Sequence, residues 1–250
     1  MRSTLRFTLA FLILCAVPGA EAQSARPQFR PAVLKSGAES LINRIDTAAL
    51  LKKGQKNGAV MFCVLVGKDG EATASWTYRQ MPGTAALDEE LTKKLEDTKF
   101  TTPLYDHQPV GVLLHGTAIF SAEETPHIRI FLNQDAREIS AESDFISPQP
   151  VIGGDSRFSG LHADNIHMPI LMTAVVDLGV KVDENGNMQN LRLLNEEPPL
   201  LGLGQAALSD LQGAKFIPAF RSGAATESDV VLPICYKPTP TQPAEQQRQE

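Results

Sequence analysis

The chain has 250 residues, of which 42% are hydrophobic and 21% charged, and a formal net charge of −6. This balance is typical of a protein with a packed core. An acidic chain without a basic stripe argues against nucleic acids and anionic membrane surfaces as partners.

The first 22 residues have the pattern of a secretory signal peptide. Arg2 and Arg6 precede an apolar run at residues 9–17, which is shorter than the roughly 20 residues that a membrane span needs. The small-residue site Ala20-Glu21-Ala22 follows, so we expect cleavage after it. Cleavage changes the net charge to −7 and predicts a periplasmic or secreted protein. The alternative is an uncleaved segment that anchors the chain in the inner membrane.

An internal repeat organises the rest of the chain. Shifting the sequence by 116 positions aligns turn glycines, prolines and apolar residues, which are the positions that a shared fold constrains most. The repeat predicts a first module at residues 23–121, a connector at 122–144 and a second module at 145–237. The aligned pairs include Phe29 with Phe145, Gly70 with Gly186, Pro82 with Pro198, Leu95 with Leu211, and Lys99-Phe100 with Lys215-Phe216.

The first module reads as a helix followed by a hairpin, a second helix and a last strand. A capping-box pattern at residues 36–39 predicts a helix through about Lys53. Alternating apolar residues predict strands at 59–66 and 72–78, joined by a turn at Gly70. Leu87, Leu91 and Leu95 fall on one face of a helix that begins near Thr84. Residues 112–120 form the last strand, and 127–132 predict an extra one.

The second module repeats this order. Strands are expected at residues 176–182 and 188–194, with a turn at 183–186, a helix carrying Leu203, Ala207 and Leu211, and a closing strand at 230–236. The predicted fold class is α+β, with two tandem ββαβ modules, each a three-stranded antiparallel sheet packed on a helix. Residues 238–250 are rich in Pro, Gln and charge, which predicts a disordered tail.

The second module resembles the C-terminal domain of TonB-type energy transducers. The resemblance rests on Val180-x-Val182-x-x-x-Gly186, on Lys215-Phe216-Ile217-Pro218-Ala219, on Gly223 and on Leu232-Pro233-Ile234-Cys235-Tyr236. The first module departs from the pattern, because Thr101-Thr102-Pro103 replaces Ile217-Pro218-Ala219. The chain also lacks the long Pro-rich spacer of a full transducer, so the resemblance implies binding in the cell envelope and not energy transduction itself.

Members of that family bind a short extended segment of an outer-membrane transporter by adding it to a sheet edge. An exposed edge offers unpaired N–H and C=O groups that an incoming strand can satisfy. The resemblance therefore implies a non-enzymatic protein whose partner is a peptide segment, such as one from a TonB-dependent transporter. A structural protein that self-associates through edge strands is the alternative, and a cryptic hydrolase is less favoured. The implied peptide-binding edge comprises Val230, Val231, Leu232, Ile234 and Tyr236.

Other residue patterns favour structural roles. After cleavage two cysteines remain, Cys63 and Cys235, and both lie in strand-like runs, which favours buried thiols over a disulfide. Asp183, Asn185 and Asn187 resemble the start of a calcium loop but precede a strand, so a hairpin turn is expected. The sequence predicts no catalytic residues, no metal site and no cofactor.

Overall fold

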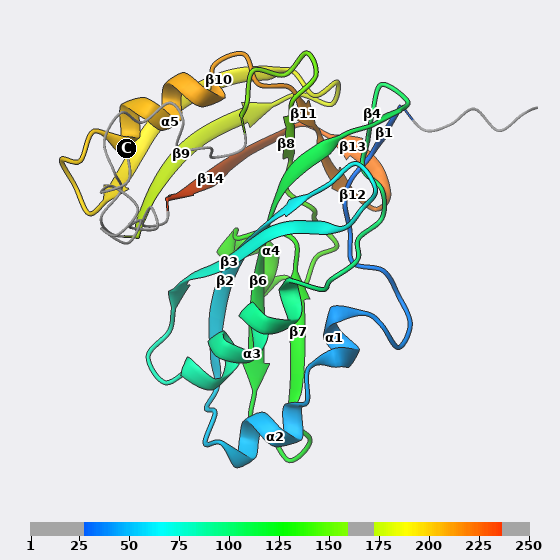
Figure 1. Ribbon diagram of the computed structural model, residues 1–250, viewed down its shortest axis with the longest axis vertical. Coiled ribbons are helices and arrows are strands. Elements are labelled where there is room, and N and C mark those ends of the chain that lie inside the picture. Colours follow the sequence, from blue (N-terminus) through cyan, green and yellow to red (C-terminus); the bar gives the residue numbers. More distant parts are fainter. Residues whose placement is uncertain (1–27, 160–172, 237–250) are drawn as a thin grey trace, which may run out of the picture.

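The computed structural model describes residues 28–159 and 173–236 (Figure 1). The predicted signal peptide at residues 1–22 and the predicted disordered tail at 238–250 lie outside these described residues. Within them the chain is an α+β protein built from antiparallel sheets, as predicted. None of the helices in this part of the chain has the length and apolar character that a membrane-spanning helix needs.

The first half of the chain contains the predicted hairpin, helix and last strand, and the extra strand that follows them. Its strands are β1 (Phe29–Arg30), β2 (Gly58–Val66), β3 (Ala72–Gln80), β4 (Leu104–Tyr105), β5 (Gln108–Pro109), β6 (Gly111–Ser121) and β7 (His127–Phe131), and its helices are α1 (Leu41–Arg44), α2 (Thr47–Lys52) and α3 (Ala85–Leu95).

The single helix expected through Lys53 is wrong. Two short helices, α1 and α2, occupy this stretch, and the backbone of Ile45 between them is extended. The side chain of Asp46 accepts a hydrogen bond from the backbone N of Ala49 and starts α2 as an N-cap. A capping residue inside the expected helix therefore ends one helix and begins another.

The second half contains the remaining elements, and its predicted strands and helix are confirmed. The elements are α4 (Ala136–Ser140), β8 (Gln149–Ile152), β9 (Ala174–Val182), β10 (Met188–Glu197), α5 (Leu203–Leu211), β11 (Phe216–Ile217), β12 (Ala219–Arg221), β13 (Ala224–Thr226) and β14 (Ser228–Tyr236).

Two larger sheets dominate the molecule (Figure 1). The second sheet has three strands in the order β10-β9-β14, whereas the first is larger than expected, with the order β11-β8-β6-β2-β3 and β7 also paired to β6. The difference arises at the outer edge of β6. There β7 pairs antiparallel along residues 117–121 and β8 pairs at Gly111 and Val112. The chain thus covers an edge that would otherwise leave backbone groups unpaired.

The first sheet is buried on both of its faces. Val60, Phe62 and Val64 of β2 belong to the same core cluster as Leu87, Leu91 and Leu95 of α3. The opposite face carries Cys63, Trp76 and Tyr78, and these residues share a second cluster with β9, β14 and α5. Trp76 and Tyr78 are both more than 90% buried. The two halves therefore share one continuous interface.

In each long hairpin the turn glycine forms a backbone hydrogen bond with the segment after the helix. The carbonyl of Gly70 accepts from the N of Phe100 at 2.7 Å, and the carbonyl of Gly186 accepts from the N of Phe216 at 3.2 Å. Both glycines have positive φ, and both phenylalanines are fully buried. A Cβ at Gly186 would lie 2.1 Å from the carbonyl oxygen of Phe216. Glycine is therefore needed here for close approach as well as for its φ.

An ion pair joins the two sheets across their interface. Arg79 at the end of β3 donates two hydrogen bonds to the carboxylate of Asp177 on β9, at 2.9 and 2.7 Å. The two side chains are 30% and 12% exposed, so water screens the pair only in part. Such bidentate pairing sets the relative position of the elements that carry it.

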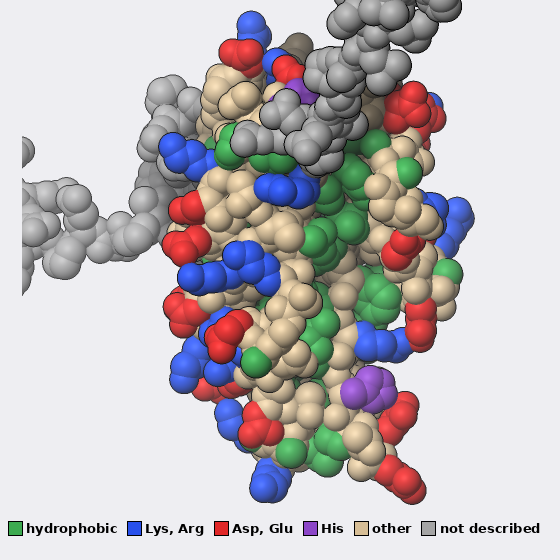
Figure 2. Space-filling view, turned by 90° about the vertical axis from the view of Figure 1, so that its right-hand side faces the viewer, with side chains coloured by type: hydrophobic (Ala, Val, Ile, Leu, Met, Phe, Trp, Pro, Cys, Tyr) green, Lys and Arg blue, Asp and Glu red, His purple; other side chains and the backbone are tan. Residues whose placement is uncertain are grey.

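The surface around α1, β1 and β12 has charges of both signs (Figure 2). On the side that carries α1, β1 and β12, acidic and basic side chains alternate around an apolar band (Figure 2). Phe29 of β1 and Phe220 of β12 are among the partly buried residues that pack against the first core cluster. The apolar side chains of these elements therefore extend the core toward the surface.

We predict that Gly186→Ala destabilises the protein more than Gly223→Ala. Both glycines have a φ of +76°, so both substitutions incur left-handed strain of about 1–2 kcal/mol. Nothing lies within 4 Å of a Cβ at Gly223, so the clash with Phe216 should add about 2 kcal/mol at Gly186 alone. Urea unfolding of the two variants measures the difference, and equal losses would show that the close approach carries no cost.

We also predict that Arg79→Met lowers the free energy of unfolding by about 2–4 kcal/mol, because it leaves the largely buried Asp177 carboxylate without its partner. The double variant Arg79→Met/Asp177→Leu should recover most of this loss. Glu90 and Lys94, an i,i+4 pair on α3, provide the control, since Lys94→Met should change stability by less than about 0.5 kcal/mol. A double variant as unstable as Arg79→Met would contradict the coupling.

Candidate functional site

The predicted peptide-binding strand, β14, lies at one end of the second sheet. It pairs along its length with β9, from Ser228 opposite Val182 to Tyr236 opposite Ala174. On its other side no described strand pairs with it. Among the described residues β14 is thus an edge strand of the second sheet, and its role in peptide binding stays a prediction.

The predicted site residues divide into two groups. Leu232, Ile234 and Tyr236 are at least 94% buried, and the Tyr236 hydroxyl donates to the carbonyl oxygen of Leu203 on α5. These side chains belong to the core beneath α5. Val230 is partly buried and Val231 is 51% exposed, so the accessible part of β14 lies near its beginning.

Pro233 reveals which backbone groups of β14 point away from β9. Proline has no N–H, so within a regular ladder it fits where its nitrogen faces away from the paired strand. In an antiparallel ladder the N–H and C=O of one residue point to the same side, and alternate residues point to opposite sides. Asp229 and Val231 have the parity of Pro233, and no register shift interrupts the ladder. Their backbone groups therefore point away from β9.

A groove of about 420 Å³ runs beside this accessible part of β14. Asp229, Val230 and Val231 all line it. Because side chains alternate between the faces of a strand, three consecutive residues can line one groove only where it follows the strand edge. The volume lies within the range of about 300–1,000 Å³ that is common for ligand sites. The remaining lining residues are Gln134, Asp135, Ala136, Ser147, Arg192 and Leu194.

The floor of the groove depends on a glycine in the central strand. Gly179 of β9 pairs with Val231 on one side and with Arg192 of β10 on the other. A Cβ at Gly179 would lie 2.9 Å from Nε of Arg192, so the arginine side chain crosses β9 directly over this glycine. It reaches Asp229, with 3.6 Å between Nη2 and Oδ1. The missing side chain thus allows a residue of β10 to take part in a site beside β14.

The wall of the groove is anchored to the first sheet. Asn133 is fully buried, its carbonyl accepts from the Thr117 hydroxyl of β6, and its Nδ2 donates to the carbonyl of Phe145 at 2.9 Å. Gln134 contacts the Tyr78 hydroxyl of β3 through a hydrogen bond. Asp135 then caps α4 by accepting from the backbone N of Arg137. Buried hydrogen bonds therefore hold the wall against the first sheet.

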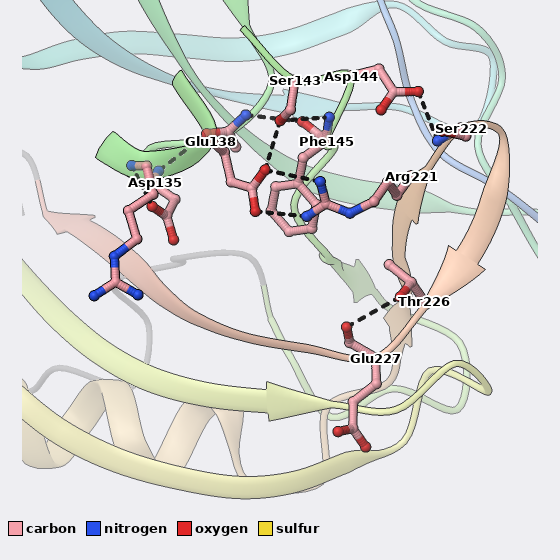
Figure 3. A network of polar contacts seen from close by, with 11 residues as sticks. Asp135, Glu138, Ser143, Asp144, Phe145, Arg221, Ser222, Thr226 and Glu227 are labelled. Atoms are coloured by element: carbon pink, nitrogen blue, oxygen red, sulfur yellow. Dashed lines mark hydrogen bonds and ion pairs between the residues drawn. The ribbon is translucent and has the colours of Figure 1, made fainter. Parts of the chain in front are cut away.

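A polar network ties α4 to the hairpin of β12 and β13, and Figure 3 shows it with Asp135 pointing from the start of α4 toward β14. The guanidinium of Arg221 donates to both carboxylate oxygens of Glu138, at 3.1 and 2.6 Å, and stacks over the ring of Phe145. The Ser143 hydroxyl also donates to Glu138. The hydrogen bonds from Arg221 and Ser143 lower the pKa of Glu138 below its ordinary value. The network holds α4 in place behind the wall.

Sequence reasoning missed the wall and the floor of this groove. The sequence places residues 134–136 in the connector and predicts only a strand position for Arg192. One local signal was present, because a glycine inside a strand of valines often marks a close approach of another group. No local pattern indicates that residues 134–136 lie beside β14, since more than 90 residues separate them along the chain.

The other predicted residues have structural surroundings. Cys63 and Cys235 are both buried thiols. Asp183 accepts hydrogen bonds from the backbone N of Asn185 and of Asn187, which is the expected hairpin turn. Within residues 28–159 and 173–236, no group of three or more His, Cys, Asp or Glu is placed to hold a metal ion.

Comparison with known proteins identifies no relative of this chain. No family model matches the sequence, and neither curated proteins nor solved structures yield a match. The likeness to TonB C-terminal domains therefore rests on the motif residues quoted above.

We predict that His115 makes stability depend on pH. Burial lowers the pKa of His115 to about 4, although its hydrogen bond to Pro233 favours the charged form. In the unfolded chain the imidazole takes up a proton near pH 6.5. The folded state should therefore have its full stability above pH 6.5 and lose up to about 3 kcal/mol as the pH falls to 4.

The variant His115→Gln tests this directly, because it removes the titrating group. Its unfolding free energy, measured between pH 7.5 and about pH 4, should fall less steeply than that of the parent. The exposed His107 supplies the control, and His107→Asn should keep the parent slope. Parallel pH profiles for the parent and His115→Gln would contradict the prediction.

Proposed function

We propose that this protein is a non-enzymatic binding protein of the cell envelope that accepts an extended peptide segment as an added strand on β14. One observation carries the proposal: the outer edge of β14 pairs with no described strand, and a groove follows it at residues 229–231. The outward N–H and C=O groups of Asp229 and Val231 could satisfy a strand of about three residues there, which would span about 10 Å.

The chain provides its own example of such strand addition. β6 begins at Gly111 and β14 at Ser228, close to the 116-residue offset of the sequence repeat. The outer edge of β6 is covered by β7, which adds antiparallel along five residues. We infer that β14 is the counterpart of β6 and that a partner segment adds to its open edge as β7 adds to β6. At the 116-residue offset, residues 229–231 correspond to residues 113–115 of β6, between the stretches that β8 and β7 pair with.

A duplicated ββαβ unit is part of this proposal. β2 and β9 begin 116 residues apart, at Gly58 and Ala174. The hydrogen bond from Phe100 to Gly70 recurs at the same offset between Phe216 and Gly186. These parallels support a tandem origin in which the first unit has closed its edge and the second has kept it open. The strands β8 and β11 then fasten the second unit to the first sheet.

The resemblance to TonB C-terminal domains extends the proposal to a partner. It favours an extended segment of an envelope protein, such as an outer-membrane transporter. The predicted signal peptide supports a periplasmic or secreted location, with an inner-membrane anchor as the alternative.

Self-association through sheet edges is the second candidate function. β10 forms the other edge of the second sheet and has ten residues, and Leu193 and Leu194 on it are 38% and 46% exposed. Long edges with exposed apolar residues favour pairing between chains. Sedimentation velocity distinguishes the candidates, since a structural role requires a dimer without any peptide.

We predict that Val231→Pro abolishes peptide binding while the fold is retained. The outward N–H of Val231 would be lost, whereas the ladder between β14 and β9 would keep its hydrogen bonds, as it does at Pro233. The probe is a fluorescein-labelled peptide of residues 126–132 of this chain, which contains β7. Fluorescence anisotropy measures binding, and the amide resonance of Val231 in the parent should shift on titration.

Two variants serve as controls for this experiment. Val231→Ile keeps the N–H and an apolar, β-branched side chain, and it should bind like the parent. Leu232→Pro removes an N–H that faces β9 and should destabilise the sheet by about 3 kcal/mol or more. Undiminished peptide binding by a folded Val231→Pro protein would exclude β14 as the docking edge.

A further inference from the structure

The groove beside β14 presents an excess of negative charge to any strand that enters it. Among its lining residues Asp135 and Asp229 are acidic and Arg192 is basic. Arg192 already contacts Asp229, at 3.6 Å, and the two side chains are 48% and 56% exposed. Within the described residues no basic side chain forms an ion pair with Asp135. The carboxylate of Asp135 instead accepts the backbone N–H of Arg137 at 2.8 Å.

The two acids lie on opposite sides of the groove. Asp135 belongs to the wall, at the start of α4, and Asp229 belongs to β14. Figure 3 shows Asp135 on the side of α4 that faces β14. A cationic side chain of an added strand would thus lie between two carboxylates. Long-range electrostatics also attract a cationic segment, because the whole chain carries a net charge of −6.

Apolar surface adjoins these charges. Val231 is 51% exposed and Leu194 is 46% exposed, and both line the groove. An incoming strand that placed only charged residues here would leave this surface in contact with water. Apolar side chains next to the cationic one would bury it, at about 25 cal/mol per Å².

The chain's own added strand has this composition. In β7, Arg129 lies between Ile128 and Ile130, and its guanidinium pairs with the carboxylate of Glu142 in the connector. Ile128 is 7% exposed and packs in the first core cluster. Strand addition at β6 therefore combines apolar burial with one basic side chain held by an acid from the flanking connector.

We propose that the groove selects extended peptide segments in which a lysine or arginine is flanked by apolar residues, with the cation between Asp135 and Asp229. The inference rests on the proposed strand addition at β14 and specifies its partner. Asp135 and Asp229 are then specificity residues, and Val231 supplies the apolar contact beside the paired backbone.

The test compares two labelled peptides on the mature full chain. One has the sequence of residues 126–132, and the other carries Arg129→Glu in that sequence. In buffer of about 20 mM ionic strength, where charges are weakly screened, the arginine peptide should bind about tenfold more tightly. The preference should shrink as salt is raised.

The double variant Asp135→Asn/Asp229→Asn should reduce the preference to about twofold or less. Asparagine keeps the N-cap of α4, so the wall should remain in place. Asp69→Asn is the matched control, because Asp69 is an exposed turn residue away from the groove whose side chain likewise accepts a backbone hydrogen bond. This control should retain the parent preference.

The outcomes separate the two proposals. Equal affinity for the two peptides, or a preference that persists in the double variant, would overturn the charge selection and leave strand addition standing. Failure of both peptides to bind, with the Val231 amide resonance unmoved, would overturn strand addition and the charge selection with it. A peptide-independent dimer that dissociates in Val231→Pro would assign the edge to a second copy.

Discussion

The burial of the first sheet on both faces is the constraint on which the rest of the structure depends. β2 places alternate side chains against α3 and against the second sheet, so neither face can be exposed without loss of core contacts. Apolar burial is the dominant favourable term in folding. The Arg79–Asp177 pair links the end of β3 to the middle of β9 and so fixes how the two sheets are positioned relative to each other. The two halves are therefore held in one arrangement, and the position of β14 follows from it.

That arrangement leaves the two corresponding strands in different situations. β6 lies inside a larger sheet, because the connector and the start of the second half supply β7 and β8 to its outer side. β14 lies at the end of a smaller sheet, where the groove adjoins residues 229–231. A strand edge is a liability unless it is covered or used. This contrast between a covered edge and an open edge is the physical basis of the proposal that the second sheet binds a partner strand and the first does not.

The groove is a product of long-range contacts. Its wall is positioned by Asn133, which joins β6 to Phe145, and α4 behind it is fastened by Arg221 from a distant hairpin. Its floor requires Gly179, which lets Arg192 cross the central strand. Each of these contacts is made between segments that are remote in sequence. A change in any of them would alter the groove without altering β14 itself.

The sequence by itself determined the long strands, the two larger helices and the hairpin turns. The spacing of apolar side chains is a local signal. It predicts a strand at Val60, Phe62 and Val64 and a helix at Leu87, Leu91 and Leu95. Gly70 and Gly186 mark turns because glycine tolerates a positive φ. The resemblance to TonB C-terminal domains also indicated that β14 is an edge strand. Only the tertiary structure decided that the first sheet has additional strands, that only the beginning of β14 is accessible and that Asp135 and Arg192 adjoin it. The physical reason is that pairing partners and groove walls depend on contacts between distant segments, which no local pattern encodes.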